Sequence, residues 1–196
     1  MISERLAKQL KFVREVDQMK NIFRQSYILD KSRKENDAEH SWHFALMVFL
    51  LDEYAKETVD VLKVIKMVLI HDIVEIDAGD TYCYDVEGNK DKLEREIKAA
   101  DRIFNILPDD QALEIRQLWD EFEAQESPEA KYAAGLDRLQ PLMLNYYGDG
   151  ISWKEHKVTY EQVIERNKHI GDGAPELWEF AMWMIDDAVE KGWLLP

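Results

Sequence analysis

The residues best suited to chemistry are two of the chain's five histidines, each beside a carboxylate in an otherwise apolar segment. His71 and Asp72 end the run VIKMVLIHD. Adjacent helical side chains point about 100° apart, but a helix end can still offer both to one ion. An apolar helix directs the pair inward, where a charge is costly without a partner or a metal. The pair therefore favours metal ligands over a solvated helix end.

Two further acids follow this pair in the string HDIVEIDAGD. Glu75 lies four residues after His71 and three after Asp72, so it shares their neighbourhood if the helix continues. Gly79 and Asp80 form a predicted turn that brings a second carboxylate back toward the pair. Imidazole and carboxylate together suit Zn, Fe, Mn, Co or Ni.

The other candidate ligands lie farther away in the sequence. His40 begins an apolar helix, with His43 one turn later; either histidine is open to a purely structural role, which is the better interpretation for His43. Asp137 stands in AAGLDRLQPL, where an unpaired acid is unusual. Pro141, four residues on, cannot donate to the Asp137 carbonyl, so we expect a helix distortion that helps to set the carboxylate. The alternative is an accidental kink, with Asp137 paired to Arg138 or another base.

Helical periodicity across the chain predicts an all-α fold, a compact multi-helix bundle. The 196 residues fit one domain, 1–196, with a metal-binding core at about 24–147 and C-terminal helices at 160–193 packed on it. No strand is convincing. The expected helices cover residues 4–23, 39–54, 59–72, 90–106, 110–125, 128–147, 160–169 and 175–193, with loops at 26–36 and 79–89 and a turn at 148–152.

The charge balance argues against several classes of function. Forty acidic residues against 25 basic ones give a net charge of −15, without the basic footprint of a nucleic-acid binder. This acidity repels phosphate esters, so a phosphate site needs a metal or a placed arginine. No apolar run reaches the roughly 20 residues of a membrane span, and the N-terminus lacks a signal peptide's apolar core. The single cysteine, Cys83, excludes an internal disulfide, and we expect a cytoplasmic protein.

The ordered set His40, His71–Asp72 and Asp137 resembles the HD superfamily of metal-dependent phosphohydrolases. The strings RKENDAEH, HDIVEIDAGD and LDRLQP are similar to the branch that contains the bacterial 5′-deoxynucleotidases and their HD-domain relatives. The similarity covers most of the chain, including SWKEHKVTYEQVIERN. An HD dipeptide alone is unspecific, whereas the four-part set in this order is specific.

The resemblance implies an HD-domain bundle that hydrolyses phosphate monoesters, converting (deoxy)nucleoside 5′-monophosphates to nucleoside and phosphate with a metal-activated water. The four matching residues would bind one divalent ion, whether Mn, Co, Zn, Fe, Ni or Mg. Arg24 matches the arginine that holds the phosphate, while Glu75 and Asp80 match residues that serve the reaction and the sugar. A homodimer is expected, because relatives are often dimeric and dimers are the commonest assembly.

One position departs from the pattern of the deoxynucleotidases. They carry a Trp directly after the arginine, where this chain has Gln25, and the spacing to His40 is also slightly longer here. Both differences leave base and sugar preference open. Members with two metals need additional histidines, and the remaining ones lack suitable spacing, so we expect one ion.

Two other functions stay open. Some HD-fold proteins are iron oxygenases, but the shortage of histidines for a second iron argues against that chemistry. A non-catalytic regulatory module would bind metal and nucleotide without turnover. The presence of Glu75 and Arg24 argues against such a module.

Overall fold

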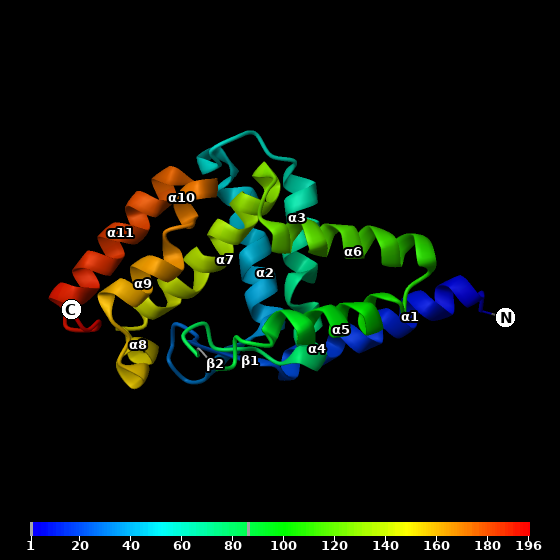
Figure 1. Ribbon diagram of the computed structural model, residues 1–196, viewed down its shortest axis with the longest axis horizontal. Coiled ribbons are helices and arrows are strands. Elements are labelled where there is room, and N and C mark those ends of the chain that lie inside the picture. Colours follow the sequence, from blue (N-terminus) through cyan, green and yellow to red (C-terminus); the bar gives the residue numbers. More distant parts are fainter. Residues whose placement is uncertain (1, 86) are drawn as a thin grey trace.

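The computed structural model describes residues 2–85 and 87–196 and confirms the all-α class (Figure 1). Short 3₁₀ helices lie at Asp17–Asn21, Asp52–Tyr54 and His71–Val74. The α-helices are α1 (Glu4–Val16), α2 (Asp37–Leu50), α3 (Val61–Ile70), α4 (Glu75–Ala78), α5 (Lys92–Phe104), α6 (Asp109–Ala124), α7 (Pro128–Tyr147), α8 (Ile151–His156), α9 (Tyr160–Asn167), α10 (Ile170–Gly173) and α11 (Pro175–Glu190).

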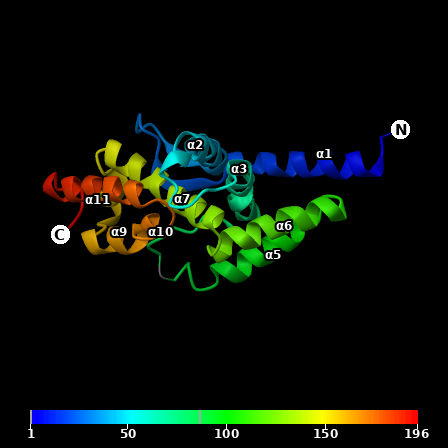
Figure 2. The ribbon, with the colours of Figure 1, turned by 90° about the horizontal axis from the view of Figure 1, so that it is seen from above.

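The central element is α7, on which helices from both halves of the chain pack (Figures 1 and 2). It begins as expected, with Ser127 as N-cap and Pro128 in the first turn. Its middle is buried against α2, α3 and α6 on one side and α10 and α11 on the other. The close approach of α10 requires Gly173, because a Cβ there would collide with the Lys131 carbonyl. The main core, around Phe44, Leu136 and Met184 among others, surrounds this helix.

The N-terminal region differs from the prediction of one helix over 4–23 followed by a loop. In the structure α1 ends at Val16, and β1 (Phe23–Tyr27) pairs antiparallel with β2 (Lys34–Asn36). The expectation of no strand was therefore wrong. These short, charged strands lack apolar alternation, so their sequence carries no strand signal. Backbone pairing forms them, and β1 carries Arg24 to the pocket described below.

The helix expected over 59–72 also ends earlier. α3 ends at Ile70, and a 3₁₀ turn carries the HD pair before α4 begins at Glu75. A 3₁₀ turn is tighter than an α-helical turn and changes the directions of consecutive side chains. Gly79 ends α4 at φ 75°, a conformation that favours glycine, as the predicted turn requires. The sequence also predicted a helix distortion near Pro141. In the structure, α7 stays helical through Pro141 without a break.

Candidate metal centre

The HD pair is buried at the inner end of α3. His71 Nδ1 lies 2.8 Å from the Val68 carbonyl oxygen, which can only accept, so this nitrogen carries the proton. His71 Nε2 is buried and has no hydrogen-bond partner among the described residues. It lies 3.1 Å from Asp72 Oδ1. In the neutral ring Nε2 therefore presents a lone pair toward a carboxylate, an arrangement suited to a shared cation.

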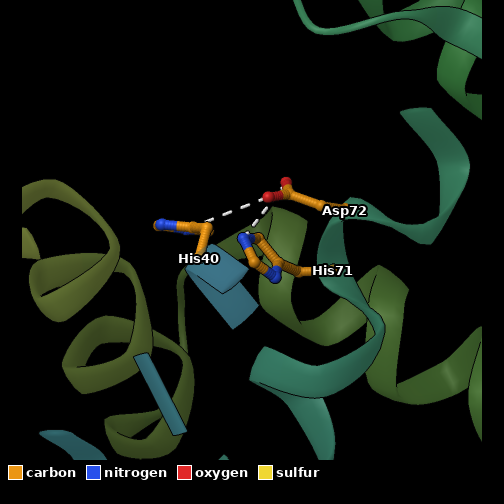
Figure 3. Close-up of side chains that lie close together, drawn as sticks. All are labelled: His40, His71 and Asp72. Atoms are coloured by element: carbon orange, nitrogen blue, oxygen red, sulfur yellow. Dashed lines mark ion pairs between the residues drawn. The ribbon is translucent and has the colours of Figure 1, made fainter. Parts of the chain in front are cut away.

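His40 approaches the same point from α2. Its ring is fully buried, and its Nε2 lies 3.8 Å from Asp72 Oδ2. Figure 3 shows His40 on one helical segment, and His71 and Asp72 on another, with their side chains close together. One ligand atom from each of His40, His71 and Asp72 lies within 4.8 Å of the others, as in a metal site. The sequence left His40 open to a structural role, and the structure places it beside the pair.

Asp137 completes the group from α7. Its Oδ1 lies 3.0 Å from His40 Nε2 and 3.5 Å from His71 Nε2. The structure therefore places all four residues of the predicted ligand set around one point, and Asp137 faces these histidines as well as lying within 4.0 Å of Arg24. Two neutral imidazoles and two carboxylates suit a divalent ion such as Zn, Mn, Fe or Co.

An outer set of hydrogen bonds orients His40. Gln140 donates from Nε2 to Glu35 Oε1 at 2.7 Å, and this contact turns its Oε1 toward His40 Nδ1 at 3.0 Å. The amide oxygen can only accept, so His40 Nδ1 carries the proton and Nε2 is left as the ligand atom. Gln140 Nε2 also faces His43 Nδ1 at 3.1 Å, which gives His43 an outer, supporting position.

The charge distribution provides a second test of whether a cation fits. Burial alone would lower the pKa of His71, but Asp72 and Asp137 raise that pKa well above its usual range. Burial would likewise raise the pKa of Asp137, yet the adjacent rings of His40 and His71 hold that pKa well below normal. Without a cation, the cluster thus attracts protons to its imidazoles. Protons and metal ions compete for the same lone pairs, so this excess of negative charge suits a divalent ion.

Asp37, which the sequence analysis missed, lies in a second acidic group with Asp72 and Glu75. It is fully buried, and neither oxygen has a hydrogen-bond partner among the described residues. Burial, followed by the charge of Asp72, raises the pKa of Asp37 to about 7. The sequence did contain a signal for Asp37: it lies three residues before His40, on the same helix face.

The remaining predicted residues border the cluster. Arg24 Nη1 donates to Asp72 Oδ2 at 2.6 Å, and Arg24 and Asp80 line the same pocket. Glu75 is buried with Oε2 unpartnered among the described residues. Burial, and then the charges of Asp72 and Asp37, raise the pKa of Glu75 well above its usual range. Burial also raises the pKa of Asp80.

This helical fold and its His/Asp cluster are the features by which the protein can be assigned to the HD-domain class. The model of the HD domain family matches residues 16–178, and the chain belongs to that family. The resemblance seen in the sequence is thereby confirmed.

Individual relatives agree with this assignment. The human 5′-deoxynucleotidase HDDC2 is 29% identical over 135 residues, which cover 68% of this chain and 65% of the relative, just under two thirds of its length. The zebrafish (Danio rerio) 5′-deoxynucleotidase HDDC2 is 30% identical over 184 residues, covering 84% of this chain and 90% of the relative. A crystal structure from Magnetospirillum magnetotacticum MS-1, described as a predicted metal-dependent phosphohydrolase, is 51% identical, with a TM-score of 0.95 and complete coverage of both chains.

We expect His71→Ala and Asp72→Ala each to lose bound metal while keeping the helical fold, because each removes a ligand atom from the cluster. Elemental analysis of the purified variants, with circular dichroism for the fold, measures this. His169→Ala is the matched control, since His169 is exposed and pairs with Asp172 instead. Full metal content in either ligand variant would remove that residue from the set.

Replacing Gln140 tests the outer set of hydrogen bonds. Gln140→Leu is expected to weaken metal affinity by roughly 10- to 100-fold, the usual effect of losing a group that orients a histidine ligand. Competition against a chromogenic chelator gives the dissociation constant. Asn145→Leu is the control, because this amide on the same helix donates to the Pro141 carbonyl rather than to a ligand. An unchanged constant in Gln140→Leu would show that His40 needs no such support.

Proposed function

We propose that this protein is a metal-dependent phosphohydrolase that converts (deoxy)nucleoside 5′-monophosphates to nucleoside and phosphate. The observation that carries the proposal is the buried cluster of His40, His71, Asp72 and Asp137, whose two carboxylates line a pocket together with Arg24. The names of the relatives, 5′-deoxynucleotidases and a metal-dependent phosphohydrolase, support the reaction class. One divalent ion in the cluster would supply a Lewis acid beside the phosphoryl group and lower the pKa of water.

Arg24 is the proposed phosphate-binding residue. Its guanidinium is only 14% exposed and is held beside the cluster by Asp72, at 2.6 Å, and Asp37, at 3.6 Å. Although burial disfavours its charge, Asp72 and Asp137 raise the pKa of Arg24 well above its usual range, so it stays cationic. A planar guanidinium presents several donors to phosphoryl oxygens and offsets the acidity around it.

Glu75 is the proposed proton-handling residue. It lies next to the cluster at the start of α4, but it is surplus to the four-ligand set. Its Oε2 is buried and has no partner among the described residues, and Glu75 also lines the pocket, where its carboxyl group can meet a water or the leaving oxygen of a substrate. Glu75 can orient the attacking water or protonate the leaving group.

The rest of the pocket suits a nucleoside. Asp80 lines it and is our proposed acceptor for a sugar hydroxyl. Tyr82, Tyr84 and Trp153 also line it and offer aromatic faces on which a base can stack. Gln25 contributes to the wall but is held by Lys34 across the hairpin. Among the described residues, no helix is both long and apolar enough to cross a membrane.

Phosphate release tests the proposed function directly. Purified protein, stripped with a chelator and reloaded with Mn, Co, Zn, Fe, Ni or Mg in turn, is assayed against a panel of nucleoside 5′-monophosphates. We expect turnover that is absent from the stripped protein and restored by at least one metal. Release that is insensitive to chelation, or no release with any metal and nucleotide, would overturn the proposal.

Glu75 variants separate chemistry from binding. Glu75→Ala and Glu75→Gln are expected to keep their metal and bind nucleotide, but to hydrolyse it at least about 10²-fold more slowly, the usual scale of general acid–base help. Single-turnover rates, together with metal content, measure both properties. Glu129→Gln is the control, because this acid belongs to a surface contact with Lys63 and the Asp60 amide. Metal loss in Glu75→Ala would instead make Glu75 a ligand.

A further inference from the structure

One wall of the pocket is an irregular segment, residues 79–85, which follows α4. Five consecutive residues of this segment line the pocket: Asp80, Thr81, Tyr82, Cys83 and Tyr84. The proposed function assigns the sugar contact and base stacking to side chains of this wall. An irregular segment has no helical or strand hydrogen-bond pattern to fix it, so contacts with neighbouring elements must hold its side chains in place.

Arg95 on α5 holds the start of this wall. Its Nη1 donates to the Ala78 carbonyl oxygen at the end of α4. Its Nη2 donates to Thr81 Oγ1 at 3.0 Å and to the Gly88 carbonyl oxygen at 2.9 Å. One planar guanidinium therefore joins the end of α4, the pocket wall and the chain that returns toward α5. Among the described residues, no other side chain of α5 forms a hydrogen bond with residues 79–85.

An ordinary surface ion pair does not explain these contacts. Arg95 Nε donates to Asp91 Oδ1 at 3.0 Å, four residues earlier, and an exposed pair of this kind contributes little to stability. The other three acceptors are two backbone carbonyls and a hydroxyl, none of which carries a charge to neutralise. Hydrogen bonds to backbone carbonyls instead fix the course of the chain.

The middle of the wall is attached separately, to α8 and to the returning chain. The ring of Tyr82 packs against that of His156, with the ring centroids 4.4 Å apart. Asn89 Nδ2 donates to the Tyr82 carbonyl oxygen at 3.1 Å. The wall is thus held from α5 and from α8. Arg95 is not among the described residues that line the pocket, so it can affect a substrate only through this wall.

We propose that Arg95 is a positioning residue for the nucleoside part of the substrate. It fixes the start of the wall and so holds Asp80 and Tyr82 where they meet the sugar and the base. A wall that is already ordered loses less conformational entropy when a ligand binds, and binding is tighter as a result. The phosphate is assigned to Arg24 and the candidate metal centre, so its binding does not depend on Arg95. The inference rests on the proposed function for the identity of the ligand.

Calorimetry on the metal-loaded protein compares two probes that need no turnover. One is a nucleoside whose 5′-phosphate is replaced by a phosphonate, and the other is inorganic phosphate. Arg95→Met keeps most of the apolar stem but removes every donor. We expect it to bind the nucleoside phosphonate roughly 10-fold more weakly, the scale of one or two lost hydrogen bonds, and to bind phosphate within about twofold of wild type.

Two further variants support this comparison. Arg95→Lys keeps the charge beside Asp91 and stays testable if Arg95→Met fails to fold. We expect it to remain at least about threefold weaker for the nucleoside phosphonate, because one ammonium group cannot reproduce the planar fork. Arg116→Met is the matched control, since Arg116 also pairs with an acid four residues away, Asp120, and with an acid on another helix, Asp101. Its affinity for both probes should equal that of wild type.

Hydrogen–deuterium exchange without ligand measures the order of the wall directly. We expect faster amide exchange at residues 79–85 in Arg95→Met, with exchange in α7 unchanged. Wild-type affinity for the nucleoside phosphonate in both Arg95 variants would overturn the proposal. An equal loss of affinity for both probes would also overturn it, because Arg95 would then support the whole site. Failure of the proposed function is a separate result, in which wild-type protein binds the nucleoside phosphonate but releases no phosphate from any nucleotide.

Discussion

Two imidazole nitrogens and two carboxylate oxygens face one another in a buried space, and the architecture around them serves to hold this contact. The nitrogen–oxygen distances from His40 Nε2 and His71 Nε2 to the carboxylates of Asp72 and Asp137 are 3.0–3.8 Å. Carboxylates brought together away from water repel each other strongly unless a proton or a cation lies between them. A proton or a bound cation is thus a condition for the stability of this arrangement.

Each candidate ligand is positioned by a different local structure, and these local structures pack around α7. A capping box formed by Asn36 and Glu39 starts α2 just before His40. The 3₁₀ turn after α3 presents the HD pair, and Trp119 supports this turn by donating to the His71 carbonyl. α7 carries Asp137 and, three residues later, Gln140, so one helix supplies both a candidate ligand and the group that orients another candidate ligand, His40.

The fold class and the grouping of the four candidate ligands were predictable because both depend on local signals. Helical periodicity marks the bundle, and an acid or histidine inside an apolar helix stands out, as His71 and Asp137 do. The hairpin of β1 and β2 was not predictable, since it forms by backbone pairing between short polar segments. Asp37, Glu35 and Arg138 were also missed. For Glu35 and Arg138 the signal is a buried atom without a partner, which appears only when distant segments are packed together, whereas the spacing between Asp37 and His40 was visible in the sequence.

The spacing of the ligands along the chain has a consequence for how the protein is made. His40 and Asp137 are in contact yet lie 97 residues apart, with the HD pair between them. A growing polypeptide cannot assemble the complete set until α7 has emerged and docked, so an ion can contact all four residues only after that step. An ion that binds only the native chain stabilises it by mass action, about 2.7 kcal/mol when free metal exceeds the dissociation constant 100-fold. In a cell, the lifetime of this protein would therefore follow the supply of its metal.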